Sequence, residues 1–305
     1  MLSHIVRLPE LSELEIPEKQ LRLHMTDDVI FCDLLNEKRT VTERDGAAEA
    51  GDYVLIRSSA ESGGEEALQI ELGQGRFPEY ERAIAGHRAG DVVEAVINGG
   101  RAVIKVESVK QVVDMPLTDE SMAALGLPGI TSLADYRRDY IGRHGEERAD
   151  RVFSAIQGKL IERLVSLAEV DIDAGELKRF HQKQRIMIQN ISDDVDKRLM
   201  DAYHGDTPEE ADRLFFADNR RSFVTYLCGL EYAARDGREP NEEERSQALW
   251  YYGLIYGKSE DEIVNGGLLD EALQSFYIQY AIGKIRAYYK SLVRFYAEGV
   301  EPLSL

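Results

Sequence analysis

Cysteine, tryptophan and long apolar runs are all scarce in this chain of 305 residues. The two cysteines, Cys32 and Cys228, form no Cys-x-x-Cys pair and no metal-binding spacing, so we expect both to be small core residues. No apolar run approaches the roughly 18 residues of a membrane-spanning helix. Residues 1–9 lack the apolar segment and cleavage site of a secretory signal. We therefore expect a cytoplasmic protein without a membrane partner.

Positive charge is also in short supply. The chain has 37 lysines and arginines against 56 aspartates and glutamates, which gives a net charge of −19. Such a surface repels nucleic-acid backbones and anionic lipids, so we expect neither as a partner. It keeps a protein soluble, and it also suits basic or unfolded polypeptides. The length allows two domains, each with its own core.

The common catalytic and metal-binding motifs are absent from the sequence. Its six histidines never occur at i, i+4 spacing, and there is no His-Glu-x-x-His. There is no phosphate-binding loop and no Gly-x-Ser-x-Gly nucleophile motif. The pair Gly73-x-Gly75 lacks the third glycine of a dinucleotide fingerprint. We expect no cofactor and no metal.

Hydrophobic periodicity divides the chain into three zones. Residues 1–45 combine extended chain, interrupted by prolines, with a helix that Thr26 caps. Residues 46–113 have mostly a period of two, which predicts four antiparallel strands around one short helix at 79–85. The strands are predicted at Tyr53–Arg57, Leu68–Leu72, Asp91–Ile97 and Ala102–Val109, with a tight turn at 98–100 between the last two.

Residues 114–305 predict a series of helices. Capping boxes, in which an acceptor side chain precedes a carboxylate by three residues, begin at Ser132, Asp173, Thr207, Asn241 and Ser259. The last predicted helix, about 266–298, is apolar on nearly every side around Phe276–Ile282. We therefore expect it to be the central helix of a bundle.

The segment Glu71–Asp91 carries a more specific signal. A strand passes through a Gly-x-Gly turn and the Phe77-Pro78 step into a short amphipathic helix, and then leaves through Gly-x-x-x-Gly-Asp. This arrangement resembles the central part of an FKBP-type prolyl isomerase domain, in particular that of the trigger factor family of bacterial chaperones. Tyr80 falls at the aromatic floor of the family's Ile-Pro-Gly-aromatic motif, whereas Glu79 replaces its glycine and one residue is missing before Pro78.

The isomerase pocket that the resemblance implies is degenerate. Prolyl isomerisation needs an apolar pocket for the proline ring. Residues 57–64 have neither the aromatic residue nor the aspartate usual in the family, and the flap loop is reduced to 98–100. Ile104 stands where an aromatic residue is usual. Only Phe77, Tyr80 and Ile104 are candidates for a residual pocket, so we assign no catalytic residue. An active peptidyl-prolyl cis-trans isomerase is the first alternative function.

The resemblance to trigger factors extends over nearly the whole chain. Leu8–Pro17 is similar to the linker that enters the family's isomerase domain, and Val112–Glu120 is similar to the exit from it. Ile172–Leu177 is similar to the start of the second long helix, with Asp173 in place of a proline. The family's ribosome-binding Gly-Phe-Arg-x-Gly-x-x-Pro loop is absent and the sequence starts at about the linker. We therefore expect no docking to the ribosome.

The resemblance implies an α+β fold, in which a small antiparallel FKBP-like domain is inserted into an elongated, two-armed, all-helical chaperone domain. Residues 1–45 would form a linker and a helix that packs on the helical domain. Residues 46–113 would form the reduced FKBP-like domain. Residues 114–305 would form the helical domain, with its arms at 146–205 and 207–258.

The function that the resemblance implies is that of an ATP-independent chaperone, or holdase, for unfolded or partly folded polypeptides. A holdase must expose scattered apolar groups on a charged frame. Consecutive aromatic residues cannot both face one narrow helix stripe, so some should be exposed, although each also suits a core position. The candidate client-binding residues are Phe180, Ile186, Met187, Ile188, Phe215, Phe216, Phe223, Tyr226, Trp250, Tyr251 and Tyr252. A dedicated adaptor for a single protein partner is the second alternative, and a homodimer through the same surface stays open.

Overall fold

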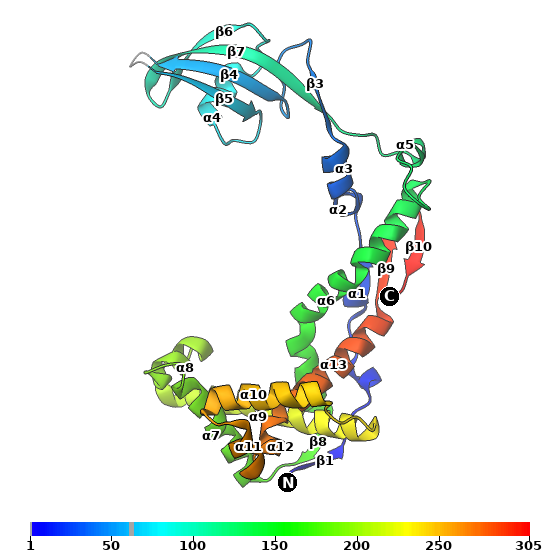
Figure 1. The fold of residues 1–305 in the computed structure, drawn as a ribbon, viewed down its shortest axis with the longest axis vertical. Helices are drawn as coiled ribbons and strands as arrows, with labels where there is room; N and C mark the ends of the chain where they lie inside the picture. Colours follow the sequence, from blue (N-terminus) through cyan, green and yellow to red (C-terminus); the bar gives the residue numbers. More distant parts are fainter. Residues whose placement is uncertain (1, 61–63) are drawn as a thin grey trace. The chain divides into compact units, whose positions relative to one another are not determined.

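The computed structural model describes residues 2–60 and 64–305, so part of the segment 57–64 discussed above lies outside the described residues. By its contacts the chain forms two compact units. The helical unit comprises residues up to His24, Ile141–Tyr296 and Glu301–Leu305. The sheet unit comprises Met25–Tyr140 and Ala297–Val300. The fold is α+β, with long helices and a small antiparallel sheet, as the sequence predicts (Figure 1).

The sheet unit is built around the long strand β7 (Figure 1). One edge of β7 pairs with β4, which in turn pairs with β5, and the other edge is shared by β6 and β3. The strands are β3 (Thr40–Glu43), β4 (Tyr53–Ala60), β5 (Glu65–Glu71), β6 (Val92–Ile97) and β7 (Gly100–Val113). The sequence analysis missed β3, because its four exposed residues carry no alternation and its pairing with Val113–Lys110 is a long-range contact.

Local chemistry explains the tight turn and the helix of the sheet unit. Asn98 and Gly99 both have positive φ, of 50° and 79°, as a two-residue hairpin turn requires. Helix α4 (Pro78–Ile84) packs Tyr80 and Ile84 against the sheet. The other large members of this core are Val54, Ile56, Ile70, Leu72, Ile97, Ile104, Val106 and Val109.

A buried arginine joins two of the remaining helices of the sheet unit. Arg137 donates to both carboxylate oxygens of Asp27, at 2.8 and 2.6 Å, and to the carbonyl oxygen of Glu298 at 2.9 Å. The helices are α2 (Asp27–Ile30), α3 (Cys32–Lys38), α5 (Asp119–Ala124) and the beginning of α6 (Leu133–Leu167). Cys228 is buried, but the expectation of a core position is wrong for Cys32, which is exposed on α3 because that helix buries Leu34 instead.

The helical unit contains the rest of α6 and most of the other helices. These are α1 (Glu18–Leu21), the 3-10 helix η1 (Leu11–Leu14), α7 (Ala174–Gln189), α8 (Val195–Tyr203), α9 (Pro208–Arg235), α10 (Glu242–Tyr256), α11 (Glu260–Asn265), α12 (Leu269–Ala272) and α13 (Gln274–Leu292). Short strands complete it: β1 (His4–Arg7) pairs with β8 (Glu169–Asp171), and β2 (Arg22–His24) pairs with β9 (Arg294–Ala297), followed by β10 (Val300–Leu303). No described helix is both long and apolar enough to cross a bilayer.

The predicted helix starts are confirmed by their hydrogen bonds. At each of the five predicted starts, the side chain of the first residue accepts from the backbone N–H three residues later. The reciprocal bond that completes a capping box is present at Asn241 and Ser259. Each such bond is worth about 1 kcal/mol, because it satisfies a donor that the helix leaves free.

The last predicted helix is not one helix. The chain breaks near Leu273, continues as α13 and becomes extended at Val293, so that Phe295 in β9 is fully buried and pairs with Leu23 of β2. The expectation of a central helix at 266–298 is therefore wrong. Helix α9 holds more buried residues than any other described helix and packs against α7, α8 and α13.

Candidate functional site

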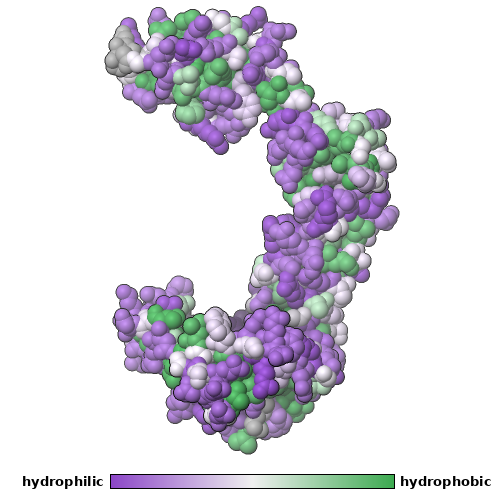
Figure 2. Space-filling view, viewed as in Figure 1, coloured by the Kyte–Doolittle hydropathy of each residue, from purple (hydrophilic) through white to green (hydrophobic). Residues whose placement is uncertain are grey.

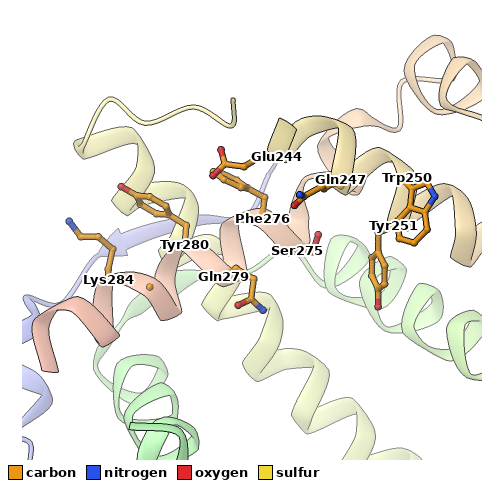
Figure 3. Close-up of a pocket in the computed structure, with 11 residues that line it drawn as sticks. Glu244, Gln247, Trp250, Tyr251, Ser275, Phe276, Gln279, Tyr280 and Lys284 are labelled. Atoms are coloured by element: carbon orange, nitrogen blue, oxygen red, sulfur yellow. The ribbon is translucent and has the colours of Figure 1, made fainter. Parts of the chain in front are cut away.

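A groove of about 930 Å³ lies between α10 and α13 in the helical unit (Figure 3). Helix α10 contributes Glu244, Gln247, Ala248, Trp250 and Tyr251, and α13 contributes Ser275, Phe276, Gln279, Tyr280, Gly283 and Lys284. Apolar atoms dominate the surface of this groove. It is the candidate client-binding site.

Helical spacing separates the exposed and the buried aromatic residues of α10. Trp250 is 69% exposed and Tyr251 is 48% exposed, whereas Tyr252 is only 9% exposed. Successive residues of an α-helix point about 100° apart, so the inward position of Tyr252 leaves Tyr251 at the rim. Leu254 extends the exposed stripe by one turn. The groove therefore has an aromatic wall that is accessible without any movement.

The two charged side chains that line the groove, Lys284 and Glu244, are each neutralised by a neighbour just outside its lining. Lys284 pairs with Asp236 at 2.9 Å, and the Tyr280 hydroxyl donates to the same carboxylate at 2.6 Å. The Tyr280 and Lys284 bonds hold the pKa of Asp236 below its ordinary value. Glu244 accepts from the backbone N–H of Asn241, the N-cap residue of α10, and pairs with Arg238. These bonds lower the pKa of Glu244.

One further contact lies at the Lys284 end of the groove. The Arg238 guanidinium lies over the Phe276 ring, 5.5 Å from its centroid. Burial raises the pKa of Tyr280 to about 12, so its hydroxyl stays protonated and continues to donate. The groove thus offers aromatic faces and neutral polar groups rather than a free charge.

A second, smaller hollow continues the groove toward α7. It shares Tyr251, Ser275 and Gln279 with the groove and has a volume of about 220 Å³. Its other apolar lining residues are Phe180, Met187, Tyr252, Ile255, Tyr256, Ala272 and Ile278. Glu271 lies at its wall, where it pairs with Lys183 and accepts from the Tyr252 hydroxyl at 2.9 Å. The two charged side chains of this hollow, Lys183 and Glu271, therefore neutralise each other.

The other client-binding candidates divide by burial. Ile186 and Phe216 are exposed, and Met187 and Ile188 are half-buried. Phe180, Phe223 and Tyr226 belong to one buried cluster between α7 and α9, and Phe215 belongs to another beside α8. With Tyr252, these residues lie in the core and reach a client only if helices separate. Figure 2 shows apolar residues gathered in small patches among hydrophilic ones on the visible face.

The three residual isomerase candidates do not share one environment. Phe77 is 41% exposed just before α4, whereas Tyr80 and Ile104 both lie in the core of the sheet unit. The Tyr80 hydroxyl lies 2.6 Å from Glu66 and 3.3 Å from Ser58, and burial raises the pKa of Tyr80. Among the described residues, no group of three His, Cys, Asp or Glu side chains could hold a metal ion.

Sequence reasoning missed the role of Glu81 in the turn before α4 and four of the residues that line the groove. Glu81 accepts from the backbone N–H groups of Gly73, Gly75 and Phe77, each at 3.0 Å, and so fixes the Gly-x-Gly turn. In the groove it missed Gln247, Phe276, Gln279 and Tyr280. The available signal was Gln279 itself, which interrupts the apolar run of 276–282 and therefore marks a side of the helix open to water.

No protein-family model matches this chain. Over 292 residues it is 25% identical to the trigger factor of Moorella thermoacetica, in an alignment that covers 85% of this chain and 63% of that protein. Over 227 residues it is 28% identical to the trigger factor of Rhodococcus erythropolis, in an alignment that covers 68% of this chain and 46% of that protein. The chain is trigger factor-like.

The trigger factor-like chain spans between about half and two thirds of the length of these curated relatives. A solved structure from work on promiscuous substrate recognition by the trigger factor chaperone aligns with a TM-score of 0.49 and 19% identity. That alignment covers 93% of this chain and 72% of the other.

Proposed function

We propose that this trigger factor-like chain is a chaperone that holds unfolded or partly folded polypeptides, and that the α10–α13 groove is a main contact site. The observation that carries the proposal is the accessible aromatic wall formed by Trp250 and Tyr251 beside Phe276 and Tyr280. Aromatic side chains bury large areas with little loss of side-chain freedom, so a few of them can bind many sequences weakly.

The hydrophilic frame supports the same proposal. A protein with a net charge of −19 resists self-association while its apolar patches stay accessible. We further propose that holding needs no ATP, which the lack of a phosphate-binding loop in the sequence supports, and that the chain does not dock to the ribosome, because its charge repels RNA. The cytoplasmic location, the three-part domain boundaries and the two arms remain predictions.

Light scattering of a chemically unfolded protein, diluted into buffer without ATP, tests the proposal. We expect equimolar chain to suppress the scattering. No suppression at several-fold excess would contradict a general holdase. Saturable binding to one folded protein would then favour the single-partner adaptor, and turnover of a proline peptide that Tyr80→Ala abolishes would favour the isomerase. If a homodimer hides the groove, diluting the stock of this chain would dissociate the dimer, and each chain would then suppress more of the scattering.

A further inference from the structure

We propose that the α10–α13 groove binds its client as an extended, uncharged apolar segment, whose backbone amides pair with the side-chain amides of Gln247 and Gln279. This inference rests on the proposed holdase function and specifies the conformation and chemistry of the occupant.

Charge complementarity favours an uncharged occupant. Lys284 is paired with Asp236, and Glu244 is paired with Arg238, so the groove has no unpaired ion to receive a charged client side chain. Taking a charge from water without a counter-ion is costly, whereas an apolar side chain gains free energy on the aromatic wall. The neutrality of the groove contrasts with the strong negative charge of the whole chain.

The two glutamines carry most of the unused hydrogen-bonding capacity of the groove. Within the described part of the chain, the Gln279 side chain has no hydrogen-bond partner, and Gln247 has one long bond to Glu243 at 3.4 Å. In Figure 3 both amides lie between Tyr280 at one end and Tyr251 at the other. A side-chain amide has both donors and an acceptor, which match the N–H and C=O of a peptide backbone.

The floor and length of the groove fit an extended chain. Ala248, Ser275 and Gly283 are small, and a β-carbon on Gly283 would meet no heavy atom within 4 Å outside its own helix, so a backbone can approach closely. Residues 275–284 of α13 span about 14 Å, at 1.5 Å per residue. About four extended residues cover that distance, and the hollow beside Tyr251 lengthens the path toward α7.

An extended occupant explains how one site accepts many sequences. Alternate side chains of such a segment point to opposite sides, so every second one meets the aromatic wall. The backbone groups between them are the same in every polypeptide. A helical occupant has its backbone groups bonded internally and could not use the glutamines in this way.

Trp250 is the single tryptophan of the chain and stands at the rim of the groove, so its fluorescence reports binding without a label. The probe is a blocked peptide of about eight alternating leucines and serines, long enough to cross the groove and the hollow. We expect it to shift the Trp250 emission at low and at high salt alike. The same peptide with alternate N-methylated amides should bind about tenfold more weakly, which is about 1.4 kcal/mol.

The variant Gln247→Ala/Gln279→Ala should weaken the unmodified peptide by a similar factor, whereas Gln182→Ala, an exposed glutamine of α7 outside both hollows, should not. Equal binding of the N-methylated peptide, or unchanged binding by the double variant, would overturn backbone pairing. An equal shift by a stably helical apolar peptide would show that the occupant is a helix, and loss of binding in salt would show that charge drives it.

Light scattering separates this inference from the proposed function. Suppressed aggregation with a silent Trp250 would leave the holdase intact and overturn the groove as described. If the chain neither suppresses aggregation nor binds the peptide, both proposals fail together.

Discussion

A β-carbon on Gly229 of α9 would overlap the carbonyl oxygen of Tyr277 on α13. The two helices therefore cross with backbone against backbone, and a larger residue fits only if they move apart. Tyr277 belongs to the same helix as Phe276 and Tyr280. The crossing at Gly229 thus fixes one wall of the groove to the central helix of the unit.

Gly229→Ala should lower the free energy of unfolding by about 3 kcal/mol, because the added methyl group forces the crossing open. The matched change Gly158→Ala lies on α6, where a β-carbon meets no neighbour, and should raise stability by about 0.5–1 kcal/mol through helix propensity. Urea denaturation measures both values. Similar effects of the two changes would contradict the close contact.

The neighbours Tyr251 and Tyr252 should respond in opposite ways to truncation. Tyr252 is buried, lies against Tyr256 with ring centroids 4.4 Å apart and the rings tilted, and donates to Glu271. Tyr252→Ala should therefore cost about 3 kcal/mol of stability. Tyr251→Ala should change stability by less than about 0.5 kcal/mol and weaken client binding instead. Thermal or urea unfolding, together with peptide titration, distinguishes the two; a large loss of stability in Tyr251→Ala would refute its place at the rim.

Acidification should destabilise the contact between α7 and α9. His181 lies between Phe215 and Phe216, with both ring centroids 5.0 Å away. Burial lowers the pKa of His181, and the nearby Asp212 offsets this only in part. Because the folded pKa of His181 lies below the unfolded value of about 6.5, the unfolded state takes up the proton first. The contribution of neutral His181 to stability is therefore complete above about pH 6.5 and is lost as the pH falls through the folded pKa.

The free energy of unfolding should therefore fall between about pH 7 and pH 5.5 in the wild type, and fall less in His181→Gln, which keeps a polar side chain but cannot titrate there. Urea titrations at the two pH values measure the difference. Parallel decreases in both proteins would assign the acid sensitivity to other groups.

Tyr80 should matter for folding more than for catalysis. Tyr80→Phe keeps the ring in the core but removes the bonds to Ser58 and Glu66, and should cost about 1 kcal/mol of stability. We expect the wild-type chain to leave the isomerisation rate of a proline peptide near its uncatalysed value. Substantial turnover in a protease-coupled assay, lost in Tyr80→Phe, would instead support the isomerase.

The parts of the fold that local chemistry decides could be predicted from the sequence. The turn at Asn98-Gly99 could be predicted because asparagine and glycine adopt the positive φ angles that a two-residue hairpin turn requires. The helix starts could be predicted from N-cap residues such as Asp173 and Ser259. Strand β3 and the parallel pairing of Leu23 with Phe295 could not be predicted, because both depend on partners far away in the sequence.

The candidate site could be predicted only in outline. The aromatic pairs indicated that some rings must be exposed, but helical spacing does not say which member of Phe215-Phe216 or of Tyr251-Tyr252 faces the core. That choice depends on the surrounding helices, as the burial of Phe215 beside α8 illustrates. The groove residue Gln279 escaped notice because its role depends on α10, which lies elsewhere in the sequence.

The central claim is that the aromatic wall of the α10–α13 groove holds unfolded polypeptide. Light scattering of a diluted, chemically unfolded protein should compare the wild type with Trp250→Ser/Tyr251→Ser and with Val92→Ser/Val96→Ser, whose valines are similarly exposed but lie on the sheet unit. The account predicts that the groove variant loses most of the suppression while the sheet variant keeps it. Full suppression by the groove variant, or equal losses in both, would contradict it.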